Sequence, residues 1–243
     1  MKELDDGPVP IAVPTLLSFV AGYVDSCTFL ALFGVFVAQV TGSFVIAGSQ
    51  LITHDDNILI KILAIPIFFF AGMLTTGVVV VTHGRRFGAL PWALALEEIL
   101  LAGFVGVGLL GSPFHDPGAP LALTTAFLGL SAMGVQSASV RLLMRGFGST
   151  NVMTTNTTQL AIDATTTLLA WCSRENPTIA AEFTTSCRQM FRLLPLVFGF
   201  FLGTLAGAAA YVLVGLRCVL VAMLLVAGLI AWSLVRGAFM PRR

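Results

Sequence analysis

The chain has 243 residues, of which 57% are hydrophobic and 10% are charged. A typical soluble domain carries about 25% charged residues, so this composition excludes an ordinary soluble enzyme and a disordered chain. Lys and Arg number 13 against 12 Asp and Glu, which argues against the basic surface that binds nucleic acid. The composition is typical of a multi-pass membrane protein.

Eight segments along the chain have the length of a membrane helix, which needs about 20 mostly apolar residues to cross a bilayer. They are residues 11–32, 33–52, 58–81, 90–110, 121–143, 150–170, 193–214 and 216–235. The first residues, Met-Lys-Glu-Leu-Asp-Asp, do not form the basic region of a signal peptide, so we expect the first segment to remain as a helix. Residues 172–192 form a long polar connection, either a loop or a short interfacial helix.

Two of the eight segments are unusually polar. Nine of the eleven residues 149–159 are Ser, Thr, Asn or Gln, and residues 33–52 contain a Gln, a Thr-Gly-Ser motif and a Gly-Ser-Gln motif. Segments of this kind gain little from contact with lipid. We therefore expect them to be enclosed by protein or to line a wet cavity.

The positive charges distinguish two topologies. If all eight segments cross, five Lys and Arg residues lie on one side and eight on the other. If residues 33–52 and 150–170 instead enter the membrane and return on the same side, the division is eleven against two. Cytoplasmic loops are enriched in Lys and Arg. This favours an all-α integral membrane protein with six transmembrane helices, two re-entrant segments and both termini in the cytoplasm; eight crossing helices are the alternative.

The two halves of the chain, residues 1–118 and 119–243, show the same order of segments. Three short matches recur in this order: Gly22-Tyr23-Val24-Asp25-Ser26 with Gly134-Val135-Gln136-Ser137, Val40-Thr41-Gly42-Ser43 with Met153-Thr154-Thr155-Asn156, and Phe69-Phe70-Ala71-Gly72 with Phe200-Phe201-Leu202-Gly203. The first match, with one residue removed, pairs Asp25 with Gln136. Three crossings per half would make the halves inverted repeats, a common plan of transporters.

Three motifs near the polar segments resemble those of a known family. They are Ala21-Gly22-Tyr23-Val24-Asp25, Phe36-Val37-Ala38-Gln39-Val40-Thr41-Gly42-Ser43 and Met133-Gly134-Val135-Gln136-Ser137-Ala138. They are similar to the YoaK-type family of multi-pass bacterial membrane proteins, a domain of unknown function. The resemblance covers nearly the whole chain and implies a protein of the bacterial cytoplasmic (inner) membrane. The family's Thr-Gly-Asn is Thr41-Gly42-Ser43 here, and its second-half Thr-Gly is Thr154-Thr155.

Candidate functional residues lie in and beside the polar segments. Asp25 falls inside the first helix, where a carboxylate must be paired, hydrated or protonated. It is either a proton relay or cation ligand, or a hydrogen-bonded residue that fixes the polar segment. Hydroxyls and amides near broken helix ends either bind a polar solute or satisfy the broken backbone. The candidate binding residues are Asp25, Gln39, Thr41, Gly42, Ser43, Gln136, Thr154, Thr155, Asn156 and Asp163.

Two further features concern helix packing. Glu97 and Glu98 lie about 100° apart on a helix, so they cannot share one face. Gly199, Gly203 and Gly207 form a stripe of small residues, which indicates close helix packing.

We expect a transporter or channel for a small polar or weakly charged solute, which lies in the lipid bilayer and is possibly a homo-oligomer. The alternative is a non-transporting membrane partner, assembly factor or regulatory protein. The sequence has no Ser/His/Asp set, phosphate loop or Cys/His cluster with the spacing of metal ligands. We therefore expect no enzymatic activity, cofactor, metal or nucleic-acid partner.

Overall fold

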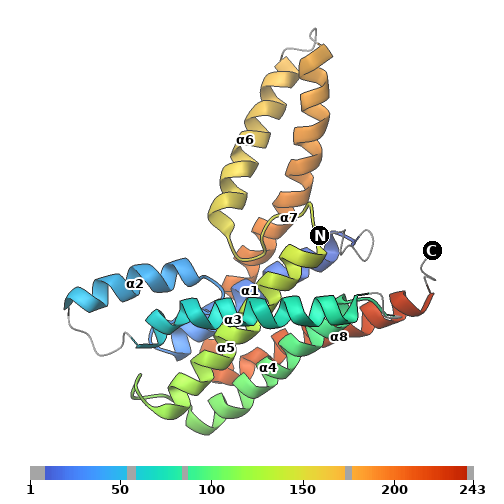
Figure 1. Ribbon diagram of the computed structural model, residues 1–243. Helices are drawn as coiled ribbons and strands as arrows, with labels where there is room; N and C mark the ends of the chain where they lie inside the picture. Colours follow the sequence, from blue (N-terminus) through green and yellow to red (C-terminus); the bar gives the residue numbers. More distant parts are fainter. Residues whose placement is uncertain (1–8, 54–58, 84–86, 173–176, 240–243) are drawn as a thin grey trace.

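The computed structural model describes residues 9–53, 59–83, 87–172 and 177–239 (Figure 1). In these residues the chain forms eight α-helices and one short 3-10 helix, and no strand. The helices are α1 (Ala12–Ala31), α2 (Val40–Thr53), α3 (Leu59–Thr82), α4 (Leu90–Gly111), α5 (Pro120–Leu143), α6 (Met153–Cys172), α7 (Pro177–Val214), η1 (Gly215–Cys218) and α8 (Val219–Phe239). The chain is therefore an all-helical protein in its described part.

Five long apolar helical stretches have the length and composition of membrane spans. Four of them are α1, α3, α4 and α5, and the fifth, Phe183–Gly237, holds most of α7, η1 and α8. Gly215 has a φ of +63° and ends α7, because a left-handed backbone cannot continue an α-helix. These stretches indicate a membrane protein. α2, with 14 residues, is shorter, and the Thr-rich α6 does not belong to the set in the described chain.

Close contact between α1 and α7 holds the centre of the bundle. Glycines of α7 lie directly against backbone carbonyls of α1, and a side chain at these glycines would collide with them. In order, the facing pairs are Gly199 with Thr15, Gly203 with Phe19 and Gly207 with Tyr23. The predicted stripe of small residues is thus a packing surface. Because both numbers rise together, α1 and α7 are parallel.

α4 is antiparallel to both of its main neighbours, α5 and α8. Gly108 of α4 faces Thr125 of α5, and Gly111 faces Leu121. Gly108 also faces η1, the segment before α8, whereas Gly237 near the end of α8 lies against Phe87, which precedes α4. α3 in turn packs against α5, where Gly134 contacts Ala71.

α6 and the first part of α7 stand away from this bundle as a helical hairpin (Figure 1). α7 has 38 residues and is about 57 Å long at 1.5 Å per residue, roughly twice the thickness of a hydrocarbon core. The expectation that protein encloses the whole Thr-rich segment is wrong. Thr154, Thr155, Thr157, Thr158 and Thr165 are exposed, because the hairpin leaves one face of α6 without a neighbour.

Candidate functional site

The loop between α1 and α2, residues 32–39, is held by Asp25. This residue is 2% exposed, and its Oδ1 accepts hydrogen bonds of 2.8 Å from the backbone N–H groups of Val37 and Ala38. The backbone and side chain of Gln39 also hydrogen-bond the carboxylate. The carboxylate therefore lies just before the first turn of α2, where the helix dipole favours negative charge. The first loop, as we call residues 32–39, is thus fixed to the interior of α1.

The loop between α5 and α6, residues 144–152, meets the first loop inside the protein. Asn151 is 4% exposed, and its Nδ2 lies 3.0 Å from both the carbonyl oxygen of Ala38 and Oγ of Ser137. Ser137 belongs to α5. Hydrogen bonds therefore connect Asp25, Ala38, Asn151 and Ser137, and join α1 to α5 through the two loops. We call residues 144–152 the second loop and its contact with the first loop the crossing.

The two loops reach α1 from its opposite ends. Ser18 of α1 lies with its Oγ 3.0 Å from the carbonyl oxygen of Thr150 in the second loop. Asp25, which holds the first loop, is seven residues further along, or about 10 Å at 1.5 Å per residue. The crossing therefore lies near the middle of α1, within a buried part of the bundle.

The two loops begin with the same backbone geometry. Leu32 ends α1 with φ −124° and ψ 48°, and Met144 ends α5 with φ −122° and ψ 52°. Two residues later, Gly34 and Gly146 have φ values of +76° and +88°, which a glycine adopts without strain. Both pairs are 112 residues apart in the chain, so the same turn occurs at corresponding positions.

The same spacing of 112 residues relates the side chains at the crossing. Asp25 contacts Gln39 in the first loop, and Ser137 contacts Asn151 in the second. The structural counterpart of Asp25 is therefore Ser137. The one-residue gap that paired Asp25 with Gln136 is wrong, because it assumed a shift that the helix geometry does not contain.

Gln136 is nevertheless part of the interior. Its side chain is fully buried, and Nε2 donates a 2.8 Å hydrogen bond to the carbonyl oxygen of Leu17 on α1. Its Oε1 has no hydrogen-bond partner in the described structure. Gln136 thus ties α5 to α1 beside the crossing and keeps one acceptor unused.

The first turns of α2 and α6 are fastened to their own loops in the same way. Ser43 Oγ donates to the carbonyl oxygen of Phe36 at 3.1 Å, and Asn156 Nδ2 donates to that of Ser149 at 2.5 Å. Each donor lies seven residues after its acceptor. Gly42 packs against the ring of Phe36. The predicted match between the Thr-Gly-Ser and Thr-Thr-Asn motifs therefore corresponds to equivalent contacts.

Four predicted site residues do not lie at the crossing. Thr41, Thr154 and Thr155 are exposed. Asp163 is 3% exposed, but it lies on α6, where Gln159 donates a 3.0 Å hydrogen bond to its Oδ1. Because α6 packs against α7, this pair belongs to the hairpin. The residues that sequence reasoning missed are Ser18, Ser137 and Asn151.

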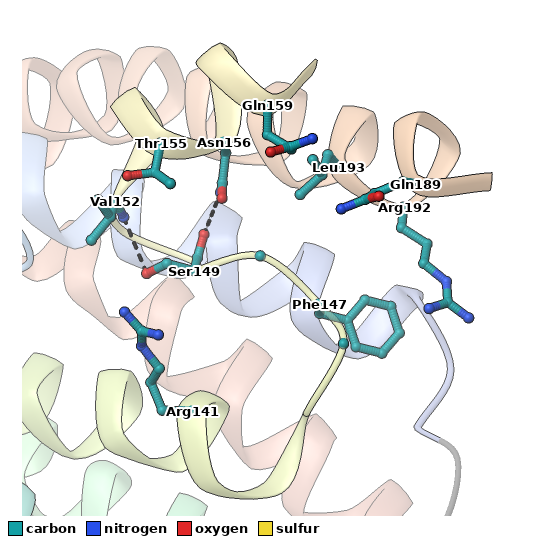
Figure 2. Close-up of a pocket in the computed structure, with 12 residues that line it drawn as sticks. Arg141, Phe147, Ser149, Val152, Thr155, Asn156, Gln159, Gln189, Arg192 and Leu193 are labelled. Carbon is teal, nitrogen blue, oxygen red and sulfur yellow. Dashed lines mark hydrogen bonds between the residues drawn. The ribbon is translucent and has the colours of Figure 1, made fainter. Parts of the chain in front are cut away.

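A cavity lies on each side of the crossing. The smaller one, of about 210 Å³, is lined by Asp25, Ser26, Phe29, Leu30, Phe36, Gln39, Thr204 and Ala208. The larger one, of about 330 Å³, is lined from the second loop, the start of α6 and the middle of α7 (Figure 2). The first cavity is built from the later halves of α1 and of the bundle part of α7. The second lies before that part of α7 begins, so the two cavities are at opposite ends.

Comparison with known proteins gives one family. The model of a family described as "Protein of unknown function (DUF1275)" matches residues 13–232. This match confirms the resemblance to the YoaK-type family and covers every helix of the bundle. No curated protein and no solved structure matches the chain.

Proposed function

We propose that this chain, which belongs to the DUF1275 family, is a secondary transporter or channel of the bacterial cytoplasmic membrane. Its solute is small and polar or weakly charged. The observation that carries the proposal is the buried crossing, where Asn151 bonds to Ala38 with a cavity on each side. Discontinuous segments that meet at mid-membrane from opposite faces form the binding sites of many transporters.

The directions of the helices support six crossings. α1 is parallel to α7, α7 turns back into α8 at η1, and α8 and α5 are both antiparallel to α4. α1, α4 and α7 therefore run one way, and α5 and α8 run the other. α5 then ends on the side where the bundle part of α7 begins. The hairpin leaves and returns on that side, which carries the excess of Lys and Arg and hence faces the cytoplasm.

The packing also supports two related halves, residues 1–118 and 119–243, in inverted orientation. α1 of the first half packs against α7 of the second, and α5 of the second packs against α3 of the first. Gly22 contacts Phe200 in one pair, and Gly134 contacts Ala71 in the other. These are the motifs that recur in the sequence, so each half places its first helix against the third helix of the other.

Asp25 gives the crossing a chemical switch. Its carboxylate accepts the N–H groups of Val37 and Ala38 only while those oxygens are free to accept. A proton or a cation taken up from the adjoining cavity competes for the same oxygens. Uptake therefore weakens the hold on the first loop and, through Ala38, the contact with Asn151. This couples occupancy of the cavity to opening of the crossing.

Solute flux into proteoliposomes tests the proposal. Purified protein is reconstituted, and osmotic swelling is followed with a panel of small solutes that includes glycerol, urea, alanine and ammonium. Transport predicts that at least one solute enters faster than into protein-free liposomes. Asp25→Asn lowers this flux at least tenfold, whereas Thr154→Ala, on the exposed face of α6, leaves it unchanged.

A non-transporting role in assembly or regulation predicts a different result. In that case no solute of the panel enters faster than into protein-free liposomes, and no solute raises the midpoint of thermal unfolding. Equal flux through Asp25→Asn and the unmodified protein would remove Asp25 from the mechanism.

A further inference from the structure

Three arginines surround the second loop at the foot of the hairpin. Arg141 and Arg145 come from the end of α5 and the residues after it, and Arg192 comes from α7. The loop is hollowed in two places, by the cavity of about 330 Å³ and by an adjoining one of about 240 Å³. Arg141 and residues 146–149 line both. The positive charge is therefore concentrated around one short stretch of backbone.

No carboxylate balances this charge in the described part of the structure. Neither cavity has an Asp or Glu among its lining residues. Like charges held near one another repel, more strongly where the surroundings are partly apolar. A bound anion would remove this repulsion, and an acidic side chain of the described chain does not.

The loop itself is held in place against the hairpin. The guanidinium carbon of Arg192 lies 5.7 Å from the centroid of the Phe147 ring, within the range of a cation–π contact. A Cβ at Gly148 would lie 2.5 Å from Oδ1 of Asn156, so glycine allows the backbone to approach α6. Ser149 Oγ accepts the N–H of Val152 at 3.3 Å. Arg192 and the loop are thus positioned before any ligand arrives.

The cavity wall offers neutral hydrogen-bonding groups between the two cations. Figure 2 shows Arg141 pointing toward Ser149 from one side of the loop, and the side chains of Thr155, Gln159 and Gln189 on the other. A volume of about 330 Å³ falls at the small end of ligand pockets, which span roughly 300–1,000 Å³. The space suits a small, highly charged group.

We propose that this cavity binds a phosphate-type oxyanion. The guanidinium fork matches phosphate oxygens with two parallel hydrogen bonds, and several cations suit a doubly charged group better than a single carboxylate. Inorganic phosphate and the phosphate of a lipid headgroup offer the same chemistry. The site is independent of Asp25 and of solute transport.

Titration with inorganic phosphate tests the site. Delipidated protein in detergent is titrated with sodium phosphate, with sodium chloride at matched ionic strength as the control, and the midpoint of thermal unfolding is followed. Arg141→Gln and Arg192→Gln weaken phosphate binding at least tenfold. Arg217→Gln, which changes an exposed arginine of η1 outside both cavities, leaves it unchanged. Gel filtration checks the folding of each variant.

A lipid arm separates the two sources of phosphate. The same variants are placed in nanodiscs of phosphatidylglycerol or phosphatidylcholine, and retained lipid is counted by native mass spectrometry. Saturable binding of free phosphate assigns the site to a soluble anion. Retention of phosphatidylglycerol alone, lost in Arg141→Gln, assigns it to a headgroup. Arg141→Lys, which keeps the charge without the fork, binds with intermediate affinity and serves if Arg141→Gln does not fold. The proposal is overturned if neither ligand distinguishes the Arg141 and Arg192 variants from Arg217→Gln.

Discussion

The side-chain amide of Asn151 donates a 3.0 Å hydrogen bond to the backbone carbonyl of Ala38, 113 residues earlier in the chain. Both residues are 4% exposed. Each belongs to a loop that follows one helix and begins the next, so two interruptions of helical structure meet inside the bundle. The bond is therefore the closest direct connection between the parts of the chain that helices leave irregular.

Removing the Asn151 side chain should destabilise the protein. Asn151→Ala leaves the Ala38 carbonyl and Ser137 without their partner, and an unpaired buried group costs about 1–3 kcal/mol. We expect a corresponding loss in the free energy of unfolding, measured by denaturant titration in detergent. Thr154→Ala is the control, because Thr154 is exposed on the adjoining helix. Equal stability of the two variants would contradict the crossing.

Two substitutions at Asp25 separate its structural and functional roles. Asp25→Ala leaves the N–H groups of Val37 and Ala38 unpaired and should lower stability by about 2 kcal/mol. Asp25→Asn keeps one oxygen acceptor and should stay within about 1 kcal/mol of the unmodified protein, since the neutral acceptor still satisfies the loop. Thermal unfolding of both variants checks this order. If Asp25→Asn is as unstable as Asp25→Ala, its loss of flux reports misfolding.

Gly203 and Gly72 form a matched pair for testing the contact between α1 and α7. A Cβ at Gly203 would collide with the carbonyl of Phe19, whereas a Cβ at Gly72 meets no atom within 4 Å. Overpacking costs about 1–3 kcal/mol, so Gly203→Ala should lower the free energy of unfolding by at least this amount. Gly72→Ala should be neutral or stabilising by up to about 1 kcal/mol, because alanine favours a helix. Equal effects would show that α1 and α7 do not pack this way.

Glu97 lies on α4 with no exposed surface, and in the described structure neither carboxylate oxygen has a hydrogen-bond partner. A buried polar group without a partner is destabilising by about 1–3 kcal/mol. Glu97→Met, which has a similar length and no polar oxygen, should therefore raise the midpoint of thermal unfolding. Glu98→Met, at a half-buried position, should change it less. A lower midpoint in Glu97→Met would mean that the carboxylate has a stabilising partner.

The position of Asp25 could be predicted from sequence, because a carboxylate among apolar residues needs hydrogen bonds that a polar loop can supply. Asn151 could not be singled out, because it is one of nine polar residues in a run of eleven and composition gives each equal weight. The exposure of Thr154 and Thr155 was missed for another reason. It depends on α7 continuing as one helix through Pro195, and a proline within a helical pattern ordinarily predicts a break or a kink.

Loop sidedness in intact cells tests the central claim, that α6 and the start of α7 leave and return on one side of the membrane. Two single-cysteine proteins are made: one keeps Cys187 of α7, and the other carries His115→Cys in the exposed connection between α4 and α5. Both are treated with a membrane-impermeant maleimide, before and after permeabilisation.

If α6 does not cross, only α5 separates the two positions. Position 115 is then labelled in intact cells, and Cys187 is labelled only after permeabilisation. If α6 crosses as well, both positions lie on the same face and show the same accessibility. That result would contradict the six-helix arrangement and the meeting of the two loops from opposite faces.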